Sequence, residues 1–334
     1  MISRKYSSIL ATLLIGATSL TACAAGDTYQ STNDGTGSTV YFTEEISPEA
    51  LVRIFNALGV EPTGNVAVKI STGESSKSHH LDPALIKNLV QQVDGTLVEC
   101  NTLYKGNRGD TESHYRAIAE RGYDTIARVE IMDATDTIHI PVVDTKWIHY
   151  DIVGSTLPNY DFMINLAHFK GHQMGGFGGV LKNASIGVAS AAGKAYIHSA
   201  GETESGWGKP DQDAFLESMA AAAQAVHNYF KQPGKDIVYI NVMNNMSIDC
   251  DCNGNPADPQ LRNMGILAST DPVALDKACL DLVFAHDSTE GDDAAPLIGR
   301  IRQMHGTHTV DYAEEIGLGN THYTLVDIDT PGQP

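Results

Sequence analysis

The sequence predicts an α/β fold: a three-layer domain with a largely parallel β-sheet covered by helices on both faces. Short β-rich runs alternate with amphipathic helical stretches along the whole chain, and most positions within several of the runs are apolar. A strand that is apolar on both sides must be buried on both sides, and the helices that connect parallel strands supply this cover. The pattern therefore favours a sheet held between two helical layers.

Seven segments are expected to form the strands. They are short, rich in Val, Ile and Leu, and bounded by turn-forming residues, as buried strands are. The expected strands are Val40–Thr43, Val66–Ile70, Thr96–Cys100, Val129–Met132, Phe162–Leu166, Ile237–Val242 and Gly265–Ala268.

Helices are expected between the strands because apolar residues recur there on one face. Asp271 followed by Pro272 is a good helix start, with the Asp side chain as cap and Pro at the first helical position. Cys279 lies on the buried face that follows, where a free thiol is the usual state. The other expected helices are Pro48–Leu58, Pro83–Val93, Thr111–Arg121 and Ala214–Phe230.

The first residues have the pattern of a secretion signal. Arg4 and Lys5 precede an apolar stretch, Ile9–Ala17, which is too short to remain as a spanning helix. The stretch ends in Leu20–Cys23, which resembles the bacterial lipobox and implies cleavage before Cys23 and lipidation of that cysteine. The alternative is an ordinary signal peptide with a stray cysteine.

The chain is accordingly divided into a signal peptide (1–22), a flexible tether (23–39), a single α/β domain (40–328) and a tail (329–334). Gly, Ser, Thr, Asn and Asp dominate the tether, as they do in flexible linkers. We expect a protein of the bacterial cell envelope, held to the membrane by its lipid and facing away from the cytoplasm. No later segment has the roughly 18 uninterrupted apolar residues of a spanning helix.

The formal net charge is −19. Such a surface repels phosphate backbones, so nucleic acid is excluded as a partner. It also disfavours electrostatic adhesion to anionic lipid, which leaves the lipid anchor as the expected membrane contact. Protein partners cannot be read from the sequence.

Four cysteines follow the lipobox: Cys100, Cys250, Cys252 and Cys279. An exported domain can pair four cysteines in three ways. Only one residue separates Cys250 from Cys252, so a bond between these two is expected to be badly strained. Disulfides and free thiols both remain open.

The segment from His168 to Lys182 carries the densest chemistry, with two histidines, two lysines and five glycines in 15 residues. Glycines this close together allow main-chain N–H groups to approach an anion or cofactor. If the preceding strand continues through His168, the side chains of His168, Lys170 and His172 point to one side. The alternative is a flexible loop with solvated histidines. The expected anion- or cofactor-binding residues are Gly176, Gly178, Gly179, Lys182, Asn183 and Lys194.

We expect one pocket to join this segment with the loops Asn101–Arg108 and Cys250–Cys252, around a divalent metal or a small carboxylate. His172 is the candidate metal ligand or general base, Lys182 the anion anchor or covalent site, and Arg108 a bidentate clamp for the substrate. The candidate metal ligands are His168, His172, His198, Cys250 and Cys252. No dinucleotide or P-loop fingerprint occurs.

Five ordered blocks resemble domain-of-unknown-function family 362, from about residue 40 to 328. The hallmark block comprises Ala167–His172 and Gly176–Asn183, followed by Gly193, Lys194 and His198. The remaining blocks are Lys69–Glu74, Cys100–Arg108 with Thr111 and His114, Asp249–Cys252, and Gly265–Lys277.

This family has no settled activity, and many members carry a ferredoxin-like insert with C-x-x-C-x-x-C runs for iron–sulfur clusters. The insert follows the histidine that matches His198. Here Gly201–Gly208 takes that place and has no cysteine. The resemblance therefore implies an uncharacterised domain without an iron–sulfur cluster of that kind.

A shorter stretch is similar to the lactate racemase family. In that family a histidine precedes a lysine by ten residues across a G-F-x-G-G turn, and His172 and Lys182 have this spacing around Gly176–Gly179. The similarity implies that Lys182 anchors a nickel-pincer nucleotide and that His172 serves at the metal.

Three functions remain open: an anchored enzyme, a binding lipoprotein that does no chemistry, and a scaffolding lipoprotein whose pocket stays empty.

Overall fold

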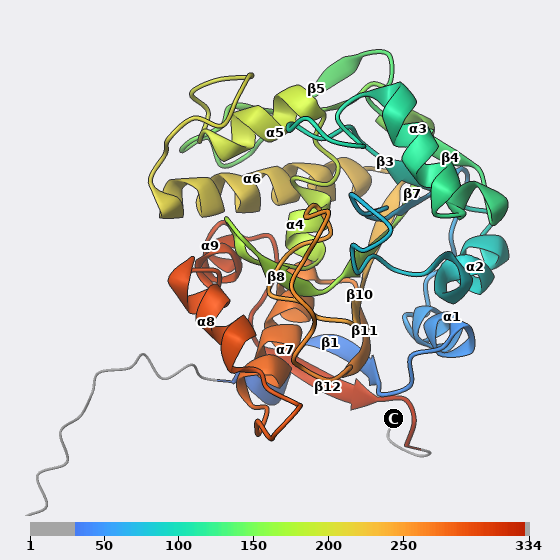
Figure 1. Cartoon of the computed structure of the whole chain (residues 1–334), viewed down its shortest axis with the longest axis vertical. Coiled ribbons are helices and arrows are strands. Elements are labelled where there is room, and N and C mark those ends of the chain that lie inside the picture. The colour runs from blue at the N-terminus through green and yellow to red at the C-terminus, as the bar shows by residue number, and fades with distance from the viewer. Residues whose placement is uncertain (1–30, 331–334) are drawn as a thin grey trace, which may run out of the picture. The chain divides into compact units, whose positions relative to one another are not determined.

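The computed structural model describes residues 31–330, and its centre is an eight-stranded sheet in the order β12-β1-β11-β10-β7-β2-β3-β4 (Figure 1). Five of the seven strand pairs are parallel, and both antiparallel pairs involve β11. In that order the strands are Tyr323–Asp327, Asn33–Thr43, Gly265–Ser269, Asp236–Met243, Phe162–His168, Val66–Lys69, Thr96–Glu99 and Val129–Ile131. The largely parallel sheet is confirmed.

Two small hairpins lie outside this sheet. One pairs β5 (Thr137–Pro141) with β6 (Tyr150–Gly154), and the other pairs β8 (Lys170–His172) with β9 (Gly176–Gly178). The second hairpin lies within the glycine-rich segment, so that segment has regular structure and is not a flexible loop.

Helices cover the sheet on both sides. They are α1 (Pro48–Ala57), α2 (Pro83–Gln92), α3 (Thr111–Glu120), α4 (Val180–Ala184), α5 (Ala191–His198), α6 (Gln212–Phe230), α7 (Pro272–Phe284), α8 (Ala295–Gln303) and α9 (His308–Glu315). Short 3-10 turns occur at Tyr123–Thr125 and Leu157–Asn159. Within the described residues, no helix is both long and apolar enough to cross a bilayer.

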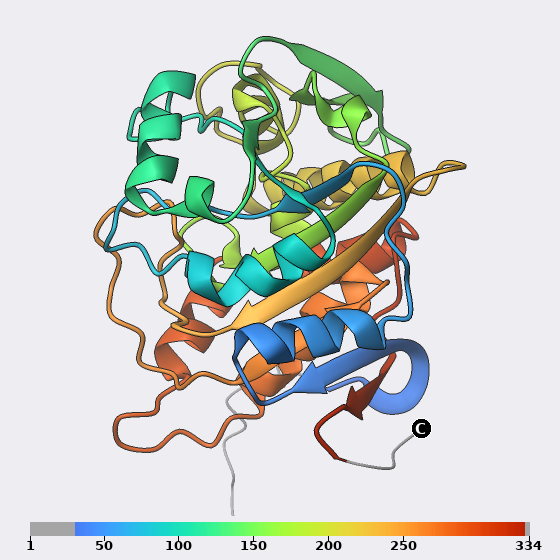
Figure 2. The same ribbon diagram turned by 90° about the vertical axis from the view of Figure 1, so that its right-hand side faces the viewer.

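The two faces of the sheet have separate cores because side chains alternate along each strand. Phe162, Ile164 and Leu166 of β7 pack with Ile54 of α1 and Leu89 of α2. The alternate residues of β7 face the other side, where Asn165 donates to the Val180 carbonyl of α4. Figure 2 shows α1 and α2 on the near side of the sheet, with α7 behind it. The three-layer prediction is confirmed.

All seven predicted strands belong to the large sheet, and α7 begins as predicted. Asp271 caps this helix by accepting hydrogen bonds from the amides of Val273 and Ala274. Cys279 is buried and free, as expected. The sequence pattern did not predict β12, either hairpin, or the helices α4, α5, α8 and α9.

The predicted tether is too long, because β1 begins at Asn33 and takes in residues 33–39. The strand forms here because its backbone pairs in parallel with β12, and the Ser38 hydroxyl donates to Asp271. The predicted tail also contacts the domain, since the Asp329 carboxylate accepts from the Thr43 hydroxyl at 2.8 Å. The signal peptide and Cys23 lie outside the described residues.

Asp151 of β6 yields a test of stability. It is buried, and no side chain of the described residues donates a hydrogen bond to its carboxylate. Burial raises the pKa of Asp151 to about 7. Since the unfolded chain ionises near pH 4, this carboxyl destabilises the folded protein increasingly as pH rises from about 4 to 7.

Asp151→Asn is therefore expected to stabilise the protein by about 1–3 kcal/mol at pH 8, with the gain vanishing near pH 4. Urea unfolding at the two pH values measures this, with the exposed Asp287→Asn as the control. A variant less stable than the wild type at pH 8 would contradict the expectation.

Candidate functional site

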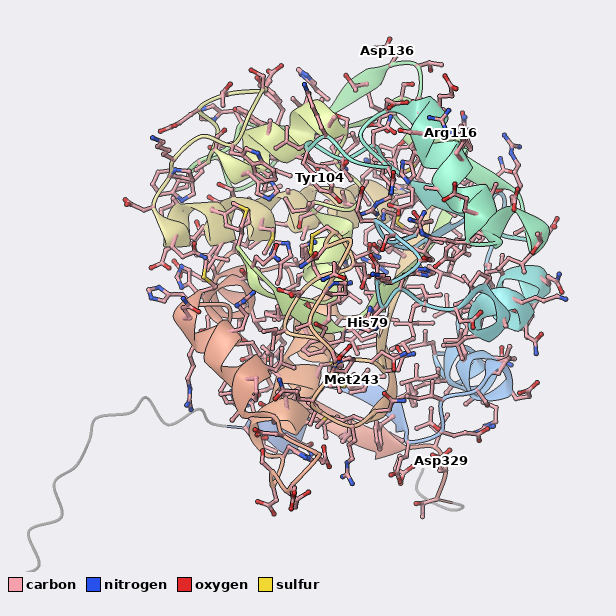
Figure 3. The ribbon with its side chains drawn as sticks, viewed as in Figure 1. His79, Tyr104, Arg116, Asp136, Met243 and Asp329 are labelled. Carbon is pink, nitrogen blue, oxygen red and sulfur yellow. A yellow bond between two sulfur atoms is a disulfide. The ribbon has the colours of Figure 1, made fainter. Side chains whose placement is uncertain are left out.

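A cavity of about 300 Å³ lies beyond the carboxyl ends of β2, β3 and β7. Parallel strands bring their carboxyl ends to one edge of a sheet, so the loops after them meet there. The three segments expected to form one pocket all line this cavity: the loop after β3, the segment from His168 to Lys182, and Cys250–Cys252. Figure 3 labels Tyr104 on the loop after β3.

The cavity wall is cationic although the protein is strongly acidic. Its five cations face only two carboxylates, Glu99 and Asp251, whereas the whole chain has a net charge of −19. The cations are Lys69, Arg108, Lys170, Lys182 and Lys194. A concentration of one sign of charge in a low-dielectric cleft attracts ligands of the opposite sign.

Asp251 is the centre of a buried ion network. Its carboxylate accepts from Lys170 Nζ and from His168 Nδ1, each at 2.9 Å. Burial alone would raise the pKa of Asp251, but Lys170 and His168 hold this pKa well below the usual range. The other nitrogen of His168 faces the Asn244 carbonyl oxygen. Both ring nitrogens of His168 are thus occupied, so its contacts do not support the predicted role of metal ligand.

Glu99 is the centre of a second network. Its carboxylate lies 3.2 Å from Lys69 Nζ and 3.3 Å from a terminal nitrogen of Arg108. Arg108 also reaches Glu74 with its Nε and donates to the Tyr104 hydroxyl. Because its guanidinium is already occupied by the protein, Arg108 holds the wall in shape, and its contacts do not support a substrate clamp.

Lys182 differs from the other four cations. No hydrogen bond or ion pair of its ammonium group occurs within residues 31–330, although Lys182 lies in the wall beside Gly178. Burial, together with the nearby charge of Lys170, lowers the pKa of Lys182 to about 7. An incompletely buried ammonium without a partner is suited to bind an anion that enters the cavity.

The backbone amides that follow Gly179 do not face an anion in the cavity, as we had predicted, but bind a carboxylate of the protein. The amides of Val180 and Leu181, directly after Gly179, donate to the buried Asp276 carboxylate at 2.9 Å each. A Cβ at Gly179 would lie 2.2 Å from that carboxylate. Asp276 therefore takes the position that we expected a ligand to take, and these amides are not available to an anion in the cavity.

Some of the other residues that we expected to bind an anion line the cavity, and others only pack behind it. Gly178 faces the cavity, whereas Gly176 packs against Gly306 and does not line it. Asn183 is a wall residue that accepts from Lys69 and donates to Asn165.

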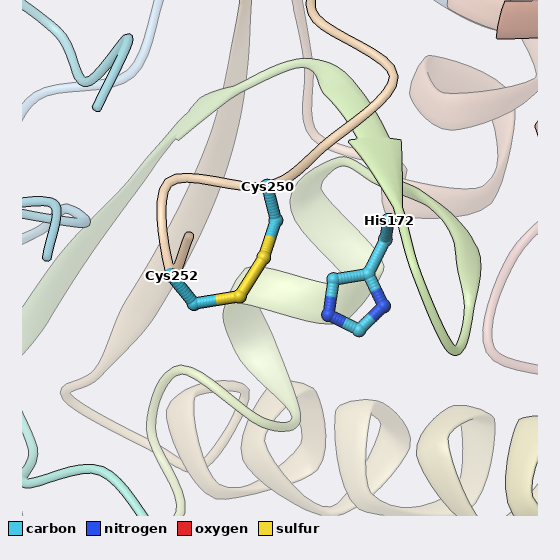
Figure 4. A group of neighbouring side chains, drawn as sticks. All are labelled: His172, Cys250 and Cys252. Carbon is cyan, nitrogen blue, oxygen red and sulfur yellow. A yellow bond between two sulfur atoms is a disulfide. The ribbon is translucent and has the colours of Figure 1, made fainter. Parts of the chain in front are cut away.

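His172 is buried, and its hydrogen-bond partners assign its tautomer. Nδ1 accepts from the amides of Met174 at 3.3 Å and Gly175 at 2.8 Å, so Nδ1 carries no proton. Burial and the charge of Lys182 place the pKa of His172 well below its ordinary value. The neutral ring therefore has its hydrogen on Nε2, which faces the sulfur atoms of Cys250 and Cys252 (Figure 4).

His198 has the opposite tautomer. Its Nδ1 donates to the Lys194 carbonyl oxygen at 2.7 Å, so Nε2 carries the lone pair of the neutral ring. Burial lowers the pKa of His198 to about 4, and the ring stacks on Phe215. Lys194 donates to the Ala189 carbonyl and has no carboxylate partner in the described part of the chain. The cavity thus has one histidine that donates and one that accepts a proton.

Cys250 and Cys252 form a disulfide, one of the states that the sequence left open for these cysteines. Their sulfurs and a nitrogen of His172 lie within 4.8 Å of one another, a grouping that a metal ion could use. Two features oppose that use. The two sulfurs are bonded to each other and are therefore not thiolates. A metal on Nε2 of His172 would also require the ring proton to move to Nδ1, which accepts hydrogen bonds from two backbone amides. The predicted metal centre is therefore not supported by these contacts.

An iron–sulfur cluster does not fit either. Cys100 is buried and donates to the Val188 carbonyl, and Cys279 is buried beside Asn241 on the α7 side of the sheet. With Cys250 and Cys252 paired, no set of four thiolates is available among the described residues.

Glu99 and Asp276 were not among the residues expected in the site. A signal was present in each, since Glu99 ends an apolar strand and Asp276 lies on an otherwise apolar helix face. A charged residue in such a position is rarely buried unless it is paired.

The comparisons with known proteins agree with the family resemblance. The model of the domain of unknown function DUF362 matches residues 66–281. No curated protein matches significantly. The lactate racemase apoprotein of Thermoanaerobacterium thermosaccharolyticum is 12% identical, with a TM-score of 0.38 over 60% of this chain and 50% of that protein.

A Thermotoga maritima protein of known crystal structure is also 12% identical, with a TM-score of 0.41 over 70% of this chain and 57% of that protein. The chain thus spans little more than half the length of either structure. Likenesses with TM-scores below 0.5 assign no function.

Proposed function

This chain belongs to the family of the domain of unknown function DUF362, and from that premise we propose that its cavity binds a small carboxylate or similar organic anion as an enzyme-like site. The observation that carries the proposal is the ammonium of Lys182, which has no hydrogen-bond or ion-pair partner among residues 31–330, in a wall where cations outnumber carboxylates by five to two. An anion in the cavity would supply the partner that Lys182 lacks. The volume of about 300 Å³ is at the lower end of ligand pockets and suits a small molecule.

The chemistry available to a bound anion is proton transfer. His172 offers a proton on Nε2, and His198 offers a lone pair on Nε2, while both rings are neutral near pH 7. A donor and an acceptor held in fixed tautomers can act as general acid and general base on one substrate. Lys182, with a pKa of about 7, supplies an uncharged amine to part of the population at neutral pH. These residues favour an enzyme over a scaffolding protein.

We propose that this site works outside the cytoplasm. The support is the lipobox sequence that ends in Cys23, which would anchor the domain to a membrane through its lipid.

Calorimetric titration with a charge-matched panel tests the anion site. Malonate and phosphate are expected to bind, with affinity that falls as salt is added, whereas malonamide and ethylenediamine are expected not to bind. Lys194→Met is expected to weaken malonate binding about tenfold because it removes a cation that has no carboxylate partner among residues 31–330. Lys87→Met, on the exposed side of α2, is the matched control and is expected to change nothing. Equal binding of malonate and malonamide, or no binding of any anion, would contradict the proposal.

A further inference from the structure

We propose that the Cys250–Cys252 disulfide is a reactive group of the cavity and undergoes thiol–disulfide exchange with a small thiol that carries a carboxylate. This inference rests on the proposed anion site, because the carboxylate would bring the thiol to the sulfur pair. It adds a redox function to a cavity whose other residues support proton transfer.

The position of the sulfur pair is the first observation. Both cysteines line the cavity, so a molecule held there by Lys182 reaches the disulfide without any rearrangement of the chain. Cys250 is buried at 2% exposure, whereas Cys252 is partly exposed, which makes the Cys252 sulfur the accessible target for an incoming thiolate. Attack there releases the Cys250 sulfur as a thiolate.

The surroundings of the sulfur pair are suited to that thiolate. A ring nitrogen of His172 lies within 4.8 Å of both sulfurs, and its Nδ1 is fixed by two backbone amides, so the Nε2–H is held near the sulfur pair as a potential donor to a thiolate (Figure 4). Lys182, which has no carboxylate partner in the described part of the chain, adds a cation to the same wall. A nearby hydrogen-bond donor and cation stabilise thiolates and make them better leaving groups.

The loop does not depend on the disulfide for its shape. Asp251, between the two cysteines, is held by Lys170 and His168, and its carbonyl oxygen accepts the Glu74 amide at 2.8 Å. The Ser78 hydroxyl donates to the carbonyl of Asn253, two residues further along the loop. These contacts remain when the sulfur–sulfur bond opens.

The disulfide also contributes little as a crosslink. It joins residues only two apart in sequence. A crosslink stabilises mainly by restricting the unfolded chain, and the restriction grows with the length of the closed loop. A loop this short restricts little, so a structural purpose does not account for the bond.

The proposed exchange needs no reactant other than the small thiol to balance its atoms and electrons. A thiolate attacks the Cys252 sulfur, the Cys250–Cys252 bond breaks, and the electron pair leaves on Cys250, giving a mixed disulfide between Cys252 and the small molecule. A second thiolate attacks the small molecule's sulfur in that bond and releases the Cys252 thiolate. Overall, two thiols are oxidised to one small disulfide, and the protein disulfide is reduced by two electrons. The reverse sequence reoxidises the protein.

The experiment compares three thiol probes on the intact native protein: mercaptoacetate, 2-mercaptoethanol and cysteamine, which are anionic, neutral and cationic. Opening is followed by alkylation, digestion and mass analysis of the tryptic peptide Asp236–Arg262, in which Cys250 and Cys252 are the only cysteines. With rates expressed per thiolate, mercaptoacetate is expected to open the bond at least tenfold faster than cysteamine.

Variants separate recognition from chemistry. Lys182→Met is expected to remove most of the preference for mercaptoacetate, whereas the surface control Lys87→Met retains it. His172→Gln, which keeps an N–H donor, is expected to open at close to the wild-type rate, and His172→Phe about tenfold more slowly with all three probes.

Two results would overturn the inference: equal rates per thiolate for the three probes, or a peptide whose two cysteines are already free in the purified protein and stay free after mild oxidation. If malonate binds to the oxidised protein in calorimetry while the disulfide stays inert to every probe, the anion site stands and the exchange reaction is rejected. If malonate does not bind and the three rates are equal, both proposals fail.

Discussion

Asp251→Asn is expected to destabilise the protein by about 3–5 kcal/mol, the largest effect on stability that we foresee for a single substitution in the site. The substitution keeps the shape of the side chain but removes the charge between Lys170 and His168. Lys170 is then a buried cation without a carboxylate partner, and the ion pair with Asp251 no longer offsets the cost of desolvating its ammonium group. Urea unfolding at pH 7 measures the loss.

The pH dependence identifies the cause. Lys170 and His168 hold the pKa of Asp251 well below its unfolded value, so the contribution of Asp251 to stability is complete above about pH 4. This contribution is lost as pH falls below that value toward the folded pKa. The stability gap between wild type and Asp251→Asn should therefore narrow in acid and stay constant from pH 5 to 7.

Two further variants act as controls. Asp258→Asn removes an exposed carboxylate from the same loop and is expected to change stability by less than about 0.5 kcal/mol. The double variant Asp251→Asn with Lys170→Met removes the orphaned cation as well and is expected to recover part of the loss. An Asp251→Asn protein as stable as the wild type would show that the buried network contributes nothing to folding.

The sequence predicted the sheet well because buried parallel strands leave a strong local signal. The run Phe162–Leu166 is apolar at every position except Asn165, and such a run favours a buried strand. β12 was missed because Tyr323–Asp327 is partly exposed along most of its length and alternates weakly. Its pairing with β1 is decided by residues almost 300 positions away in sequence, which no local pattern contains.

The sequence predicted the location of the candidate site more accurately than the roles of its residues. The carboxyl-end rule brought the three loops together, and the histidines and lysines of the dense segment do line the cavity. The roles of individual residues depend on pairings across the fold. Arg108 is occupied by Glu74 and Glu99, and the amides after Gly179 are occupied by Asp276, from a helix nearly 100 residues later.

Lys182 should control the affinity for anions through its own titration. Its pKa of about 7 in the ligand-free protein means that the ammonium form dominates below pH 7 and the neutral amine above it. Only the ammonium attracts an anion, so the affinity for malonate is expected to be constant below pH 7 and to fall about tenfold per pH unit above it. A bound anion stabilises the ammonium and raises its pKa, so the fall ends at the higher pKa of the complex.

Lys182→Met is expected to reduce malonate affinity about 30- to 100-fold at pH 6 and to flatten the pH profile between 6 and 9. The same variant should be at least as stable as the wild type, because burial disfavours the ammonium in the folded state and this cost is fully present below pH 7. Calorimetry at four pH values and urea unfolding measure the two effects, with Lys87→Met as the control. Weaker binding together with unchanged or higher stability would assign the affinity to the charge of Lys182. A flat profile in the wild type would instead mean that the other four cations of the wall bind the anion without it.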